Sequence, residues 1–481
     1  MFPFRALGSA AEFLFKRQVL RSFEGAQWAK PREVNGYLNP ENTGLLMDGD
    51  NRRLSDTESF QNVCVIARVG AGKTSRYIIP NVLDKAKSRV SLVVNDPKGE
   101  VFETTAATMA ANGYRVIVID PENVGRSSSF NPLLEAKSDI ELEQISEIVI
   151  RAGLPGNKDQ FWSLGAIRLV NVLLKCLKNA GRDDPAYFTL GNLAYLLQNF
   201  GQKGERLDSF VARYSVDPDN PSDPSTWNQW KGALTGNSEG VQSFVLNAIT
   251  ALKLASNPSV ARITSKSDFA LSELRREKTI IYFITPPQLV EYYAPLVSVF
   301  FRSVFNACMR ELPGRGALPV YILYDEFGHS TIPSFSAIAN TLRGYRASLS
   351  IVLQSIAQLE TRYGPSDAAS IQGGFNTLLT YSGSDPQTAE FFSRVVGTVR
   401  ERARERIDKI EENIKEHALM LSNEVRTIAR DEAILISTNR NPVKLKTVPY
   451  FESSRFARMA KNSRSLTLPA SHPPALTFVP L

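Results

Sequence analysis

Seven short apolar runs, rich in β-branched residues, recur along the chain, and each is followed by turn residues. They cover residues 63–67, 90–95, 115–120, 279–284, 320–324, 350–353 and 377–381. Runs of this length without polar alternation are typical of strands buried on both faces of a parallel sheet. Helical patterns at 73–87 and 101–112 separate several of the runs. The pattern therefore predicts a doubly wound α/β sheet.

Between residues 139 and 277 the strand pattern almost disappears. Helical periodicity replaces it at 139–152, 160–180, 190–200 and 241–253, and residues 217–224 form a polar, proline-containing loop. We therefore expect an all-α domain over 139–277, inserted into an α/β core made of residues 36–138 and 278–452. Charges at helical spacing predict a further, solvated helix over 401–421.

Composition adds an uneven distribution of charge to this picture. The chain has 481 residues, 43% of them apolar and 22% charged, which excludes the disordered and fibrous classes. Residues 1–35 contain six Lys/Arg and three Asp/Glu, and residues 453–481 contain four Lys/Arg and no acid. These two segments carry the whole net charge of +7. We expect a basic N-terminal segment over 1–35 and a basic, disordered tail over 453–481.

Membrane and redox signals are weak in the sequence. No stretch reaches the roughly 18 apolar residues that span a bilayer, and residues 1–15 are interrupted by Arg5 and Glu12. Residues 1–15 are read as an amphipathic or frayed end, or alternatively as a surface anchor beside anionic lipid. The three cysteines are far apart, which fits a reducing cytosol better than a disulfide framework or a zinc site.

A phosphate-binding loop is predicted between the first apolar run and the first helix. The segment Ala67-Arg-Val-Gly-Ala-Gly-Lys-Thr74 stands where the pattern GxxxxGK[ST] is expected. Its glycines let backbone N–H groups face phosphate oxygens, Lys73 would pair with the β- and γ-phosphates, and Thr74 would ligate Mg²⁺. The predicted nucleotide-binding residues are Ala67, Arg68, Val69, Gly70, Ala71, Gly72, Lys73 and Thr74. Ala67 replaces the first glycine, so either the loop tolerates it or nucleotide binding is weakened.

Two carboxylates end the apolar run at 320–324. Asp325 would hold Mg²⁺, directly or through water, and Glu326 would orient or deprotonate the attacking water. Together with the phosphate loop this pair predicts hydrolysis of ATP or GTP. Gln354 ends the next run and would sense the γ-phosphate, unless it is a plain strand-end residue. Arg343 and Arg346 are candidates for an arginine inserted into a neighbouring subunit's site, or are exposed arginines at the end of a helix.

Several further segments resemble the coupling proteins of type IV secretion and conjugation, the TraG/TraD-like family. The resemblance covers about residues 60–452. It rests on the phosphate loop and the Asp325-Glu-Phe box, together with Asn95-Asp-Pro-Lys-Gly-Glu100, Gly113-Tyr-Arg-Val-Ile-Val-Ile-Asp-Pro121, Ser129-Phe-Asn-Pro132, Phe161-Trp162, Leu353-Gln-Ser355, Asp385-Pro-Gln-Thr-Ala-Glu390, Gly397, Asp431-Glu-Ala-Ile-Leu-Ile436 and Val448-Pro-Tyr450.

The resemblance implies a homohexameric ATPase with a RecA-like P-loop core, interrupted by an all-α domain that engages relaxosome or effector proteins. It implies ATP and Mg²⁺ as cofactors, and single- or double-stranded DNA and secretion-channel subunits as partners. Arg343 matches the family's trans-acting arginine, whereas Asp96 and Lys98 receive no chemical step. Relatives usually begin with two transmembrane helices, which this sequence does not show. We therefore expect a protein of the bacterial cytoplasm, peripheral at the inner membrane through a partner or its N-terminal segment.

Three functional hypotheses remain at this point. The first is an ATP-driven motor that moves DNA or protein into a secretion channel, with Glu326, Lys73, Arg343 and Gln354 as catalytic residues. The second is a nucleotide-gated substrate receptor or scaffold with little turnover, which the alanine at position 67 suggests. The third is a DNA translocase of chromosome segregation or repair, similar to FtsK or HerA.

Overall fold

A nine-stranded sheet with the order β12-β11-β8-β2-β7-β6-β3-β5-β4 forms the centre of the protein. The computed structural model describes residues 20–154, 160–235, 238–329, 331–404, 412–462 and 466–481. All neighbouring strands from β8 to β4 are parallel, and β11 runs antiparallel to β8 and β12. The strands are β2 (Val63–Ile66), β3 (Ser91–Asp96), β4 (Arg115–Ile119), β5 (Thr279–Ile284), β6 (Val320–Tyr324), β7 (Ala347–Leu353), β8 (Thr377–Tyr381), β11 (Glu432–Ser437) and β12 (Val443–Lys446).

The seven strands predicted from apolar runs all lie in this sheet. Five of them are buried at every position, as expected for strands covered on both faces. The structure adds β11 and β12, which the sequence analysis did not predict as strands. It also starts β7 at Ala347, three residues before the predicted run. The prediction of a doubly wound α/β core is confirmed.

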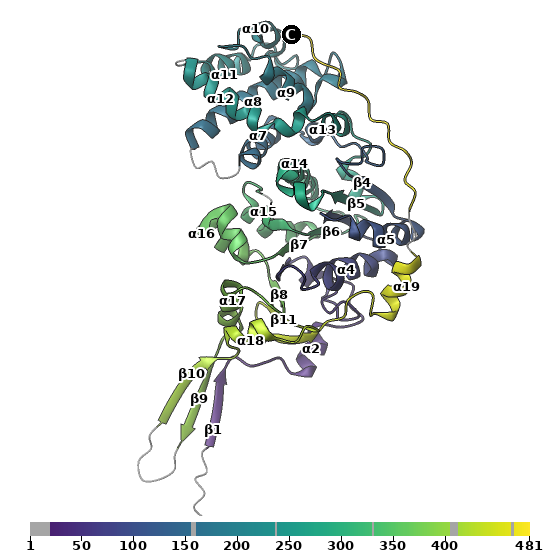
Figure 1. The fold of residues 1–481 in the computed structure, drawn as a ribbon, viewed down its shortest axis with the longest axis vertical. Coiled ribbons are helices and arrows are strands. Elements are labelled where there is room, and N and C mark those ends of the chain that lie inside the picture. The colour runs from purple at the N-terminus through teal and green to yellow at the C-terminus, as the bar shows by residue number, and fades with distance from the viewer. Residues whose placement is uncertain (1–19, 155–159, 236–237, 330, 405–411, 463–465) are drawn as a thin grey trace, which may run out of the picture.

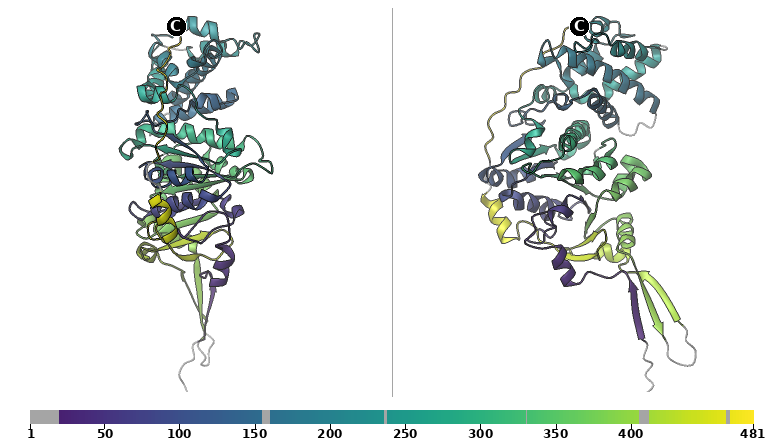
Figure 2. Two further views of the ribbon diagram at one scale, coloured as in Figure 1. Left: turned by 90° about the vertical axis from the view of Figure 1, so that its right-hand side faces the viewer. Right: turned by 180° about the vertical axis from the view of Figure 1, so that it is seen from behind.

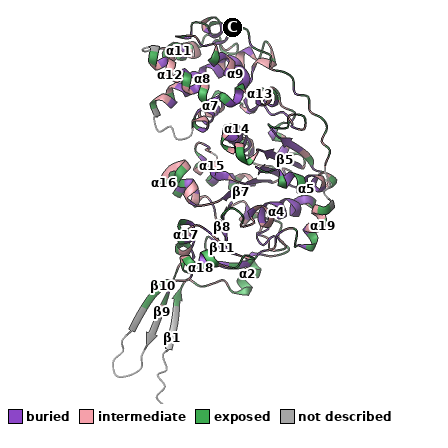
Figure 3. Cartoon of the chain, in the orientation of Figure 1, coloured by how far each residue is buried: buried purple, intermediate pink, exposed green. Residues whose placement is uncertain are grey.

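Helices cover the two faces of the sheet and bury its apolar side chains in two clusters. One face is covered by α14 (Val290–Met309), α15 (Phe335–Leu342), α16 (Ala357–Gly373), α17 (Pro386–Val396) and α18 (Ser422–Thr427). The other is covered by α2 (Pro31–Tyr37), α4 (Ile79–Asp84), α5 (Glu100–Ala111) and α19 (Ser454–Asn462), and the short helix α3 (Asp56–Ser59) precedes β2. Figure 3 shows buried residues along the sheet and on the helix faces turned toward it.

A helical domain stands at one end of the molecule, beyond α14 (Figure 1). The chain enters it after β4 and returns to the sheet at β5, the neighbour of β4. Its helices are α6 (Pro132–Glu135), α7 (Asp139–Gly153), α8 (Gln160–Ala180), α9 (Leu190–Gln198), α10 (Asp208–Tyr214), α11 (Ser225–Ala233), α12 (Ser238–Ala251) and α13 (Pro258–Ile263). Those from α6 to α12 enclose a separate apolar cluster, to which Val299 of α14 and Val479 also belong, and α13 packs into the cluster on the α14 face of the sheet. The prediction of an inserted all-α domain is confirmed.

A three-stranded ribbon projects from the opposite end of the molecule (Figure 2). It consists of β1 (Leu20–Gly25), β9 (Thr398–Arg404) and β10 (Glu412–Ala418), all antiparallel. The predicted charged helix over 401–421 is therefore wrong. Oppositely charged residues face each other across the strands, as Arg400 and Glu416 do, with a 3.7 Å ion pair. These cross-strand pairs stabilise a ribbon that has little apolar surface to bury.

The C-terminal end of the chain differs from expectation. The described part of the predicted disordered tail is ordered, so that prediction is wrong for residues 453–462 and 466–481: α19 packs on α5, and residues 466–481 run as an extended segment onto the all-α domain (Figure 1). Docking against other parts of the protein orders a segment that has no helix or strand of its own. One basic side chain of α19, Arg455, pairs with Asp84 of the core at 3.2 Å. The predicted amphipathic end at 1–15 lies outside the described residues. Within the described ranges, none of the helices has the length and apolarity that a membrane span requires.

Candidate functional site

The ends of three adjacent strands bring the predicted site residues together. β7 lies between β2 and β6 in the sheet, so the segments after these strands meet at one edge. The phosphate loop follows β2, Gln354 follows β7, and Asp325 and Glu326 follow β6. In open α/β sheets, ligands bind outside the carboxyl ends of the strands. The sequence placed these residues at strand ends, and the strand order explains why they share one site.

The loop after β2 has the backbone that phosphate binding requires. Gly70 and Gly72 have φ angles of 81° and 87°, in the left-handed region that favours glycine. The Lys73 ammonium lies within the loop and donates to the carbonyl oxygens of Ala67 at 2.7 Å and Arg68 at 3.3 Å. A turn of π-helix (Thr74–Ile78) then leads into α4. The loop therefore curls in front of a helix start, as predicted.

Ala67, the departure from the expected glycine, fits its place without backbone strain. Ala67 does not have a positive φ angle, so a Cβ causes no backbone strain at this position. The side chain is fully buried in the apolar cluster on the α4 face of the sheet, and its N–H donates to the carbonyl of Leu353 at 3.0 Å. Ala67 extends the β2 pairing with β7 by one residue. The conformational reason for expecting a defective loop does not apply.

Asp325 is joined directly to the phosphate loop. The Thr74 hydroxyl donates to its Oδ2 at 3.2 Å, and the N–H of Glu326 donates to Oδ1 at 2.9 Å. Burial raises the pKa of the Asp325 carboxyl to about 6, and the charge of Glu326 adds to the rise while Lys73 opposes it. A buried carboxylate beside a threonine hydroxyl is a suitable pair of oxygen ligands for Mg²⁺.

Glu326 and Gln354 form the second half of the site. The Gln354 side-chain amide donates to Oε2 of Glu326 at 2.6 Å. Glu326 has a φ angle of 53°, which turns its side chain away from the direction of β6. The backbone N–H of Gln354 is held in turn by the side chain of Gln358 at 2.8 Å. The predicted acid and the predicted sensor are therefore in direct contact across the ends of β6 and β7.

The charges around Lys73 are balanced by this arrangement. Burial lowers the pKa of the Lys73 ammonium, the nearby carboxylates of Glu326 and Asp325 oppose that change, and Lys98 adds to it. Lys98 of the Asp-Pro-Lys-Gly segment is thus close enough to add positive potential to the loop. A glycine loop, two lysines, a hydroxyl and two carboxylates together provide donors for phosphate oxygens and ligands for a divalent cation.

Two residues at the end of β3 were not assigned a role from the sequence. Asn95 donates from its side-chain amide to the backbone carbonyl of Asp325 at 2.6 Å, and its Oδ1 is buried without a hydrogen-bond partner. Asp96 accepts the N–H of Phe102 at 2.8 Å and so caps α5. Burial raises the pKa of the Asp96 carboxyl to about 7. The sequence does show that both residues end an apolar run, as Asp325 does. It does not show that β3 pairs with β6, which brings them beside Asp325.

Arg343 does not reach the site of its own chain. It is exposed at the end of α15, four residues before β7 begins at Ala347, whereas Gln354 follows the last residue of β7. The arginine therefore lies toward the opposite edge of the sheet from the phosphate loop. Arg346, three residues later, has its backbone in the left-handed region and donates to the carbonyl of Ala317. This position excludes Arg343 from the site within one subunit.

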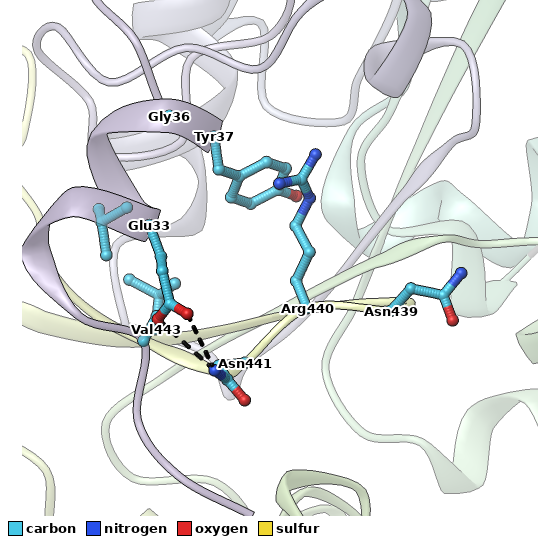
Figure 4. A pocket seen from close by; sticks show the side chains of 9 residues that line it. Glu33, Gly36, Tyr37, Asn439, Arg440, Asn441 and Val443 are labelled. Atoms are coloured by element: carbon cyan, nitrogen blue, oxygen red, sulfur yellow. Dashed lines mark hydrogen bonds between the residues drawn. The ribbon is translucent and has the colours of Figure 1, made fainter.

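A cavity of about 620 Å³ lies apart from these strand ends, between α2 and the β11–β12 turn (Figure 4). Arg440 stacks over the ring of Tyr37 at 4.4 Å and pairs with Glu58 at 2.6 Å. Glu33 accepts a hydrogen bond from Asn441. The charged groups named here are already engaged with one another, and none belongs to the phosphate loop or the acidic pair. The cavity therefore adds nothing to the nucleotide chemistry of the strand ends.

Comparison with known proteins identifies relatives over most of the chain. VirD4 of Rhizobium radiobacter is 26% identical over 421 residues, which cover 82% of this chain and 58% of that protein. A conjugal transfer protein TraG of Escherichia coli is 25% identical over 76% of this chain and 60% of its own length. The chain thus spans less than two thirds of these curated relatives.

Solved structures confirm the fold prediction. The bacterial conjugative coupling protein TrwBdeltaN70, in an unbound form, superimposes with a TM-score of 0.69 over 89% of this chain and 94% of its own, at 15% identity. The plasmid coupling protein TrwB in complex with ADP and Mg²⁺ gives 0.68 over 90% of this chain and 95% of its own, also at 15% identity. Residues 20–471 match the family described as Type IV secretory system Conjugative DNA transfer. The chain therefore belongs to the type IV secretory system conjugative DNA transfer family.

Proposed function

We propose that this protein is an ATP-hydrolysing coupling protein that recruits DNA or protein substrates and drives them into a type IV secretion channel. The observation that carries the proposal is the meeting of the phosphate loop, Asp325, Glu326 and Gln354 at three adjacent strand ends. Family membership supports the transport role, and the relatives named VirD4 and TraG support a coupling function. TrwB bound to ADP and Mg²⁺ supports the choice of cofactor.

Each side chain has a role in this proposal that its contacts support. Lys73 and the N–H groups of the glycine loop would hold the phosphates, and Thr74 and Asp325 would hold Mg²⁺. Bound MgATP supplies the phosphoryl group whose transfer to water releases free energy. Glu326 would accept a proton from the attacking water, and Gln354 would hold the Glu326 carboxylate in position through its 2.6 Å hydrogen bond.

The position of Arg343 supports an assembly of several subunits. An arginine outside its own site fits a role in the site of a neighbouring subunit, where it would stabilise charge on the transferring phosphoryl group. A closed homohexamer satisfies this in every subunit, and a cavity along its axis would contact DNA through phosphates. Relaxosome or effector proteins would bind the all-α domain. The protein would work at the cytoplasmic side of the inner membrane, held by a partner or by its N-terminal segment.

Replacing Lys73 by alanine tests the proposal. We expect Lys73→Ala to abolish ATP hydrolysis and substrate transfer in a strain that lacks the native gene. The matched control is Lys87→Ala, because Lys87 is exposed at the far end of the same helical segment and lies outside the site. Transfer of DNA and of protein is scored separately. Full transfer by Lys73→Ala would refute the motor, and nucleotide binding by the native chain without turnover would favour a receptor.

A further inference from the structure

Residues 473–481, the last part of the C-terminal segment 466–481, lie in a groove on the all-α domain. The groove is bordered by α9, α13 and the 3₁₀ turn Lys253–Ser256. Before the groove, Leu466 and Leu468 pack against the α/β core, and the N–H of Ser471 donates to the carbonyl of Gly125 at 2.8 Å. Beyond it the segment continues in an extended form along the all-α domain (Figure 2). Residues 466–481 contain no Asp, Glu, Lys or Arg, so charge does not hold the segment there.

Two polar side chains of the groove form hydrogen bonds with the backbone of the segment. Asn192 is buried, donates to the carbonyl of Thr477 at 2.9 Å and accepts the N–H of Val479 at 3.0 Å. Arg262 donates to the carbonyl of Pro473 at 3.3 Å from Nε and 3.2 Å from Nη2. All these bonds are to main-chain atoms of the segment. They require an extended peptide but not a particular side chain.

Apolar contacts provide the selectivity that the backbone contacts lack. Val479 is 1% exposed and belongs to the apolar cluster of the all-α domain. Leu476 lies against Gly191, where a Cβ would come within 2.9 Å of it, so the missing side chain makes room for the leucine. The ring of Phe478 is 4.6 Å from that of Tyr195, yet Phe478 is 56% exposed. A cavity of about 400 Å³ between the segment and the groove walls leaves room for larger side chains.

We propose that this groove is a peptide-binding site for an extended, apolar, proline-containing segment of a partner protein, and that residues 473–481 occupy it as an internal competitor. Backbone recognition by a buried asparagine, two buried apolar positions (Pro473 and Val479) and shallower ones between them form a site that accepts any segment of this chemistry. The inference rests on the proposed function, in which the all-α domain binds substrates, and it names the site and the type of ligand.

Competition from residues 473–481 lowers the apparent affinity of the groove for a partner's segment. A tethered segment acts at an effective concentration in the millimolar range for short linkers. A segment from another protein must therefore displace it, and removal of the segment should raise the measured affinity for a free peptide at least tenfold. The contacts of Val479 should contribute most, because it is the deepest side chain of the segment. The side chain of Thr477 should contribute nothing, because it is exposed and its residue is held through the backbone.

The test is binding of a fluorescein-labelled peptide with the sequence of residues 470–481, followed by fluorescence anisotropy. It is measured with the full chain, with a chain that ends at residue 472, and with a full-length Val479→Asp variant that keeps the segment but releases its anchor. If truncation lowers the thermal unfolding temperature, the Val479→Asp chain replaces the truncated chain in the comparison. Peptides with Val479→Asp and with Thr477→Ala are the matched pair.

We expect the truncated chain and the Val479→Asp chain to bind the native peptide at least tenfold more tightly than the full chain. We expect the Val479→Asp peptide to bind at least tenfold more weakly, and the Thr477→Ala peptide to bind like the native one. The inference would be overturned if the truncated chain folds but does not bind the peptide, or if all three chains bind the native peptide with equal affinity. ATP hydrolysis is measured on the same samples, so failure of the groove and failure of the proposed ATPase are separate results.

Discussion

The Asp325 carboxylate destabilises the folded chain when no cation is bound. Its pKa rises from 3.8 to about 6 on folding, because burial and the charge of Glu326 disfavour the ionised form. Each unit of such a shift corresponds to about 1.4 kcal/mol, so at pH 7 the ionised group costs roughly 3 kcal/mol of folding free energy. The shift already includes the attraction to Lys73. An asparagine at 325 has the same shape without the charge.

We expect Asp325→Asn to be more stable than the native chain at pH 7, by up to about 3 kcal/mol, and to hydrolyse no ATP. The amide oxygen can accept the N–H of Glu326, and the amide nitrogen can donate to Thr74, so both hydrogen bonds of the carboxylate have replacements. A raised carboxyl pKa means that the folded state binds more protons at Asp325 between pH 4 and 6, so Asp325 lowers the stability of the native chain across that window as pH rises. The variant should lack this contribution, so its stability relative to the native chain should rise with pH.

The assay is urea unfolding of both chains at pH 4.5, 6 and 7.5 with EDTA and without nucleotide. The control is Asp385→Asn at the start of α17. Burial raises the pKa of the Asp385 carboxyl, but the hydrogen bonds from Thr388 lower that pKa by more. Asp385→Asn should not stabilise the chain at any pH. The reasoning is refuted if Asp325→Asn is less stable than the native chain at pH 7.5, or if their difference does not shrink toward pH 4.5.

Three further changes test other parts of the structure. Gln354→Ala should lower kcat about 10²-fold, because it frees the Glu326 carboxylate, while the affinity for ATP stays within twofold. Replacing the exposed Glu360 of α16 by alanine is its control in the same ATPase assay. Arg343→Ala should leave nucleotide affinity unchanged and abolish turnover, and mixing it with Glu326→Gln should restore part of the activity if the arginine acts across subunits; no recovery at any ratio would contradict that. Asn62→Ala should destabilise the chain by about 3 kcal/mol in urea unfolding, because the buried Asn62 side chain bonds three backbone groups, two of them buried, and the residue has a φ angle of 64°; a loss below 1 kcal/mol would contradict this expectation.

The buried strands and long helices were predictable because burial leaves a periodic pattern in the sequence. β5, β6 and β8 begin and end at the predicted residues, as does α8. Sequence also placed the phosphate loop, Asp325 and Gln354 at strand ends. It could not show that β7 lies between β2 and β6, since strand order depends on contacts between distant residues. For the same reason the contact of Asn95 with Asp325 was missed.

The errors occur where elements have little buried surface or depend on distant partners. β9 and β10 are dominated by charged residues, and spacing of Arg and Glu fits a solvated helix as well as a ladder of cross-strand pairs. Residues 466–481 have no periodicity, and they are ordered by Asn192, Arg262 and the groove rather than by local structure. Neither outcome is encoded in a short stretch of sequence.

The backbone at Glu326 has an evolutionary consequence. With φ at 53°, a residue that carries a Cβ costs about 1 kcal/mol relative to glycine, and asparagine is tolerated better than glutamate. Under selection for folding alone, glycine or asparagine would thus be favoured at this position. A glutamate that persists there is maintained by selection for its carboxylate. A copy of this gene that had lost its activity should therefore lose Glu326 before it loses the apolar residues of β6.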